Sequence, residues 1–144
     1  MFVITPLPAG EVDTEAAAAR RQLAEGPEPC RRCLRNTGVG DPLVLAPYNP
    51  FLRSSPYAGD GPVFVHADGC DPFASEPDVM SEQVAGRVLS VRAYDADAMM
   101  TGASVLPGEE LAGRLPELLE GPDVAFLHVH FAGPGCFGFR VDRA

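Results

Sequence analysis

Apolar and polar residues alternate along the last quarter of the chain, where "VAFLHVHF" is followed by "AGPG" and then by "CFGFRVDR". A period of two is typical of β-strands, and a short Gly/Pro-rich stretch between two such runs indicates a hairpin. Four earlier runs carry a strand pattern too: "LVLAPYN", "PVFVHA", "RVLSVRAYDA" and "AMMTGASVL". The pattern therefore predicts about six strands, the last two of which form a C-terminal β-hairpin.

Two segments have helical features instead. The run "VDTEAAAARRQLAEG" offers a capping Thr, a stretch of alanines and a closing glycine, which predicts a helix over about 15–25. The run "PGEELAGRLPELLEG" predicts a second helix, because Glu109 and Glu110 suit a positive helix N-terminus. Pro116 lies within this run and should kink the helix or mark a new start.

No repeat or composition break divides the chain, so we expect one domain over 1–144. The turn-rich segment 26–42 should be a cysteine-containing loop, and 43–144 should form the sheet. Within the sheet region, 68–86 reads as an irregular link with one helical turn. These elements predict an α+β fold with a mostly antiparallel sheet and two helices.

Side-chain parity assigns the residues of the predicted hairpin to two faces. The apolar face should carry Leu127, Val129 and Phe131 of the first strand and Phe137, Phe139 and Val141 of the second. The other face should carry His128, His130, Cys136 and Arg140. Because paired residues share a face, a five-residue loop would place His130 directly opposite Cys136, and a three-residue loop would keep the two on the same face, one place displaced.

The same parity in two upstream strands adds residues to the polar face. If all these strands are neighbours, one sheet face should carry His66, Arg92, Tyr94, His128, His130, Cys136 and Arg140. All three histidines of the chain would then lie on one face, which is unusually rich in reactive side chains.

Three interpretations of this face remain open. As a zinc or iron site, it would use His128, His130 and Cys136 as ligands, with Cys30 as a further candidate and His66 or Cys70 as alternatives. As a catalytic site, it would use the two histidines for acid–base chemistry and Cys136 as the nucleophile. Its remaining catalytic candidates are Arg92, an anion clamp, and Asp95, an orienting carboxylate. The third interpretation is a set of ordinary strand residues.

The motif "PCRRCL" is a single C-x-x-C, whereas the strong zinc signal is two such pairs. Nearby arginines would favour a thiolate at this motif. Cys30 and Cys33 are therefore half of a metal site, a reactive pair or two unremarkable thiols.

Composition excludes several kinds of partner. A net charge of −9 and a pI near 4.6 argue against nucleic acid and anionic membranes, which require a basic surface. All 11 basic residues are Arg, so lysine-dependent chemistry is excluded, and no nucleotide-binding motif is present. Without a signal-like start or a long apolar run, we expect a cytoplasmic protein with free thiols.

Four stretches together resemble a family of small bacterial proteins known as domain of unknown function 1203. They are "PCRRCL", "LVLAPYNPFLRSSPYAGDGPVFVH", "VLSVRAYDADAMM" and "VAFLHVHFAGPGCFGFRVDRA", and the resemblance runs from about Pro29 to the last residue. It implies that the family motif includes Cys30, Asp95, His128, His130 and Cys136. This chain departs from the family pattern at His66, Cys33 and Phe131.

The sequence leaves two functional hypotheses, and whether the protein is an enzyme stays open. One is a small enzyme or metal-binding protein that uses the His/Cys/Arg face, in the enzyme's case on a small molecule. The alternative is a non-catalytic binding module, or a homodimerisation module, that holds no metal.

Overall fold

The computed structural model describes residues 1–73 and 79–144. Its strands are β1 (Phe2–Thr5), β2 (Arg20–Leu23), β3 (Pro42–Tyr48), β4 (Gly61–His66), β5 (Val88–Tyr94), β6 (Met100–Pro107), β7 (Phe126–Phe131) and β8 (Phe137–Arg143). A π-helical turn, η1 (Val79–Gln83), a 3-10 turn, η2 (Gly108–Glu110), and the helix α2 (Leu111–Glu120) complete the described elements.

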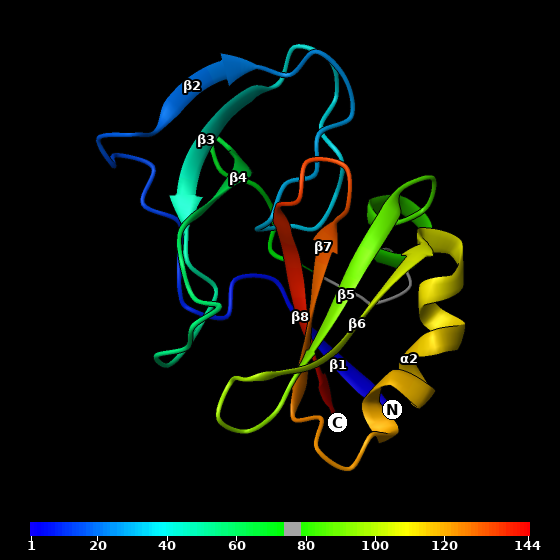
Figure 1. The fold of residues 1–144 in the computed structure, drawn as a ribbon. Helices are drawn as coiled ribbons and strands as arrows, with labels where there is room; N and C mark the ends of the chain where they lie inside the picture. The colour runs from blue at the N-terminus through cyan, green and yellow to red at the C-terminus, as the bar shows by residue number, and fades with distance from the viewer. Residues whose placement is uncertain (74–78) are drawn as a thin grey trace.

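These strands form two antiparallel sheets (Figure 1). The larger sheet has the order β1-β8-β7-β5-β6, and the smaller has the order β2-β3-β4. The mostly antiparallel α+β fold and the C-terminal hairpin of β7 and β8 are therefore confirmed. The numbers differ from the prediction, because the described residues contain eight strands and one α-helix.

The predicted helix over 15–25 is wrong, because Arg20–Leu23 forms β2, which pairs with β3. All four residues of β2 are exposed. The alanine run has no stripe of large apolar side chains that a helix could bury, and packing supplies most helix stability in proteins. Hydrogen bonding to β3 satisfies this backbone instead.

The second predicted helix is confirmed as α2, and Pro116 lies inside it without ending it. Its buried residues Leu111, Leu115 and Leu119 are four apart, so they share one face. They pack against apolar side chains of β5, β7 and β8 in the main core. Within the described residues, no helix is long and apolar enough to cross a membrane.

The larger sheet is covered on both sides. Helix α2 lies on one side, and the smaller sheet lies on the other (Figure 1). A second core cluster joins Val44, Val63 and Val65 of the smaller sheet to Phe137 at the start of β8. The face that was predicted to be polar is thus largely an interior surface between the two sheets.

A β-bulge in β8 changes the predicted register. Val129 pairs with Phe139, but the next residue, His130, pairs with Phe137, so Gly138 is the extra residue. The direct pairing of His130 with Cys136, which a five-residue loop would give, is therefore wrong. Parity fails at the bulge, because Phe137 joins the cluster between the sheets and Cys136 packs against the main core.

The predicted neighbours on the polar face are confirmed in part. Arg92 of β5 pairs with His128 of β7, which pairs with Arg140 of β8. His66 ends β4 in the smaller sheet, so the three histidines do not share one sheet face. Strand parity assigned the faces of β5 and β7 correctly, but strand order, which sequence alone does not fix, separated His66 from the others.

Replacing Gly138 should destabilise the protein, because a Cβ there would lie 3.0 Å from the Val129 carbonyl oxygen and 3.2 Å from the Phe131 ring. We expect Gly138→Ala to lower the free energy of unfolding by about 1–3 kcal/mol. Urea denaturation, monitored by circular dichroism, measures this free energy. Gly102→Ala in β6, where a Cβ meets nothing within 4 Å, is the control and should change stability by less than about 0.5 kcal/mol. Equal effects would contradict the bulge's steric role.

Candidate metal centre

Four metal-ligand side chains converge beside the smaller sheet: Cys30, Cys33, His66 and Cys70. One ligand atom from each lies within 4.8 Å of all the others. In the part of the chain that the structure describes, no other His, Cys, Asp or Glu residues meet this criterion as a group of three or more. Cys30 and Cys33 are buried, and the other two are half-buried.

The spacing of these atoms suits a tetrahedral ion. The sulfurs of Cys30 and Cys70 are 3.8 Å apart, and the Cys33 sulfur is 3.8 Å from Nδ1 of His66. Sulfur ligands at about 2.3 Å from a tetrahedral zinc lie about 3.8 Å from each other. The longest donor separations need to shorten by only about 1 Å to reach this geometry.

Backbone contacts of the C-x-x-C loop bring its two cysteines to β4. The Arg31 amide donates to the Phe64 carbonyl, and Cys30 forms a parallel bridge with Phe64. The loop turns back at Leu34, whose amide donates to the Cys30 carbonyl and whose φ is 57°. His66 ends the neighbouring strand and so meets the loop.

The three thiols of the cluster do not ionise alike. The pKa of Cys30 is well below its usual range, chiefly because the Cys33 thiol donates a hydrogen bond to its sulfur. Backbone N–H groups of Cys33, His66 and Arg32 contribute in the same direction. The same hydrogen bond, with burial, raises the pKa of Cys33, and burial and the charge on Cys30 raise that of Cys70. One thiolate therefore sits beside two thiols that keep their protons.

Charged groups surround the cluster. The Asp41 carboxylate lies 3.7 Å from Nε2 of His66, on the side of the ring away from Cys33. A carboxylate in this position orients a histidine that binds metal through its other nitrogen. The Arg32 guanidinium hydrogen-bonds to Cys70 and so offsets part of the negative charge that several thiolates would bring.

The structure does not bring together the four metal ligands that the sequence suggested. Cys30 belongs to the cluster above, whereas Cys136 accepts a hydrogen bond from Nη2 of Arg31 at 2.7 Å. His130 donates from Nδ1 to the carbonyl of Gly135, 3.0 Å away. His128, His130 and Cys136 belong to no described group of donors that could hold an ion.

His128 is fully buried in an aromatic cage. The rings of Phe51, Tyr94, Phe126 and Phe137 have centroids 4.8–5.2 Å from its own. Neither ring nitrogen has a hydrogen-bond partner. Burial is the main cause that lowers the pKa of His128 to about 3, and nearby cationic groups act in the same direction. The side chain is therefore a neutral core residue at pH 7.

Three of the five catalytic candidates do meet. Arg92, His130 and Cys136 line one cavity of about 260 Å³ between the sheets. Asp95 is engaged elsewhere, since its Oδ1 accepts from the amides of Asp97 and Met99 and holds the turn between β5 and β6. The catalytic role of this set stays a prediction.

The sequence pattern suggested His66 and Cys70 as alternative metal ligands beside the hairpin histidines. It did not indicate that they form one ligand set with Cys33. The signal was present, because a C-x-x-C and an H-x-x-x-C together supply four donors. Its two halves are separated by the whole of β3 and most of β4, so their proximity depends on the pairing of those strands.

Comparisons with known proteins give a family and no close relative. A family model described as "Protein of unknown function (DUF1203)" matches residues 27–143. This match confirms the resemblance that the sequence motifs carry, and it covers all four members of the Cys/His cluster. No curated protein and no solved structure matches the chain.

His128 should make the protein sensitive to acid. The unfolded chain binds a proton near the usual histidine pKa of about 6.5, whereas folded His128 binds one only near pH 3, so stability falls as pH drops through this window. Replacing His128 by Phe removes this effect. Relative to wild type, His128→Phe should gain about 2 kcal/mol between pH 7 and pH 5, measured by urea denaturation. Parallel curves for the two proteins would contradict a neutral, unpartnered His128.

Proposed function

This chain belongs to the DUF1203 family, and we propose that it binds a zinc ion through Cys30, Cys33, His66 and Cys70. The convergence of four ligand atoms within 4.8 Å of one another carries this proposal. Ordering three thiols and an imidazole from three separate segments costs conformational entropy. A bound ion would compensate this cost. A Cys₃His set is one of the standard structural zinc sites.

The ligand types favour zinc over other ions. Thiolate and imidazole are soft or borderline ligands that suit zinc, whereas calcium and magnesium prefer oxygen. The raised pKa values of Cys33 and Cys70 are compatible with a metal site, because a divalent cation supplies the positive charge that lets these two thiols lose their protons.

The proposed role of the ion is structural. Four protein ligands complete a tetrahedron, so no position remains for a substrate or a reactive water. The ion would link the C-x-x-C loop to the end of β4 and to Cys70 beyond it. Segment 26–41 contains no regular strand or helix, so this link would replace the hydrogen-bonded ladder that fixes the rest of the fold.

The first test is the metal content of protein purified without a histidine tag or chelators. We expect about one zinc per chain by elemental analysis, and Cys30→Ser should lose it. Because zinc binding is coupled to folding, chelation should lower the melting temperature by about 10–20 °C.

Cys136→Ser is the matched control for the metal measurement, because Cys136 lies outside the cluster and should leave the zinc content unchanged. Zinc in neither protein, or equal zinc in wild type and in Cys30→Ser, would contradict the proposed site. Near-stoichiometric iron in place of zinc would support the proposed ligands and show that the bound metal is iron.

The affinity for zinc should depend steeply on pH. Between about pH 7 and pH 8, Cys30 is a thiolate and Cys33 and Cys70 hold protons, so binding must release about two protons. Affinity should rise by about 100-fold over this pH unit, measured by competition with a chelator whose own pH dependence is known. Calorimetry in two buffers of different ionisation enthalpy counts the protons. Release of none would contradict the pattern of thiol ionisation.

A further inference from the structure

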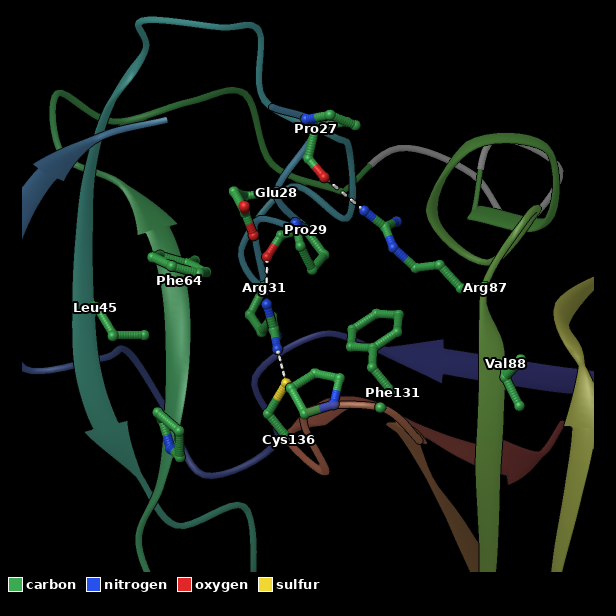
Figure 2. A pocket seen from close by; sticks show the side chains of 13 residues that line it. Pro27, Glu28, Pro29, Arg31, Leu45, Phe64, Arg87, Val88, Phe131 and Cys136 are labelled. Carbon is green, nitrogen blue, oxygen red and sulfur yellow. Dashed lines mark hydrogen bonds between the residues drawn. The ribbon is translucent and has the colours of Figure 1, made fainter. Parts of the chain in front are cut away.

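A cavity of about 520 Å³ lies between the two sheets, next to the C-x-x-C loop (Figure 2). Figure 2 shows Arg31 at its centre, with Leu45 and Phe64 on the side of the smaller sheet and Phe131 and Arg87 on the other. The zinc ligands described above do not line it. Its volume is in the range of sites that hold small organic molecules.

Arg31 is a buried cation with unused hydrogen-bond donors. It is 1% exposed, and its guanidinium donates to the carbonyls of Phe137 and Pro29 and to the sulfur of Cys136. A guanidinium has five N–H groups, so two remain available. Among the described residues it has no carboxylate partner within salt-bridge distance, which is unusual for a buried charge.

Arg87 adds a second positive charge to the same cavity. Both guanidinium carbons lie over the ring of Phe131, 4.9 Å from its centroid for Arg31 and 5.4 Å for Arg87. Among the described residues, Arg87 donates only to neutral oxygens, those of Asn36, Gln83 and Pro27.

Among the described residues that line the cavity, Glu28 is the one that is acidic. Burial lowers the pKa of the Arg87 guanidinium, and the charge of Glu28 opposes this shift. Two cations and one anion leave the lining with a net positive charge, in a protein whose overall charge is −9.

The rest of the cavity wall is apolar. Leu45 and Phe64 are directly paired across β3 and β4, so both project from the same face of the smaller sheet. Val88, Phe131 and several prolines complete the lining. A hydrated inorganic anion would leave this surface unused, whereas an organic acid would place its carboxylate at the arginines and its apolar body along the wall.

We propose that this cavity binds a small organic acid, with the carboxylate at Arg31 and Arg87 and the apolar body against Leu45, Phe64 and Phe131. Guanidinium N–H groups match the two oxygens of a carboxylate. The available donors of Arg31 and the net positive lining define the anionic end, and the paired residues of β3 and β4 define the apolar end. This proposal does not depend on metal binding.

Calorimetric titration of the full chain with octanoate, octanamide and inorganic phosphate tests the proposal. Octanoate should bind saturably, and octanamide should bind about tenfold or more weakly, because it lacks the charge. Phosphate should bind much more weakly than octanoate, because it lacks an apolar body. Equal affinity for octanoate and octanamide, or for octanoate and phosphate, would overturn the proposal, and so would no binding of octanoate.

Substitutions at Cys136 test the role of Arg31 without removing the buried cation. Cys136→Asp places a carboxylate beside Arg31, where it should act as an internal ligand and weaken octanoate binding about tenfold or more. Cys136→Ser is the neutral control and should retain octanoate affinity. Leu45→Glu, which places a negative charge on the apolar wall, should also abolish binding.

Zinc content and circular dichroism of each variant separate failure of the cavity from failure of the fold or of the metal site. A folded Cys136→Asp or Leu45→Glu protein that binds octanoate like wild type would overturn the proposed ligand position. Octanoate binding by a protein that contains no zinc would support the cavity and contradict only the metal centre.

Discussion

The buried guanidinium of Arg31 connects the separate parts of this fold. It reaches from the C-x-x-C loop to the first residue of β8 and to Cys136, while the amide of the same residue donates to β4. A buried cation is costly unless hydrogen bonds replace its lost hydration, and neutral carbonyl oxygens supply part of that replacement here. The loop and the two sheets must therefore keep their relative positions for Arg31 to keep these hydrogen bonds. This requirement explains why a segment with no regular structure is nevertheless buried at its centre.

The Cys/His cluster and the His128 cage each show what burial does to a titratable group. His128 stays neutral because aromatic rings surround it and offer no hydrogen-bond acceptor. Cys30 can be a thiolate because Cys33 and several amides donate to its sulfur. Burial alone therefore does not decide ionisation. The hydrogen-bond partners around each group decide whether it is charged: His128 has none and stays neutral, whereas Cys30 has several donors and can be a thiolate.

Local sequence pattern predicted the strands of the sheet region and the α2 helix, because these elements bury regular apolar faces. It failed for β2, where four exposed residues form a strand only because β3 offers partners for their backbone. It failed at Gly138, where one extra residue reverses the faces of Cys136 and Phe137. The ligand set was missed for a related reason. Cys33 and His66 meet through the pairing of the loop with β4, a long-range contact that no local pattern encodes.

The spacing of the C-x-x-C motif links the two proposals physically. Cys30 and Cys33 turn their sulfurs toward His66, and the intervening Arg31 extends in another direction, to the cavity and Cys136. An ion bound to both cysteines would fix the backbone on either side of Arg31 and hold its guanidinium in place before a ligand arrives. A pre-positioned donor loses less conformational entropy on binding than a flexible one. A structural zinc would thus contribute to recognition of an acid that it does not touch, through the rigidity of four residues.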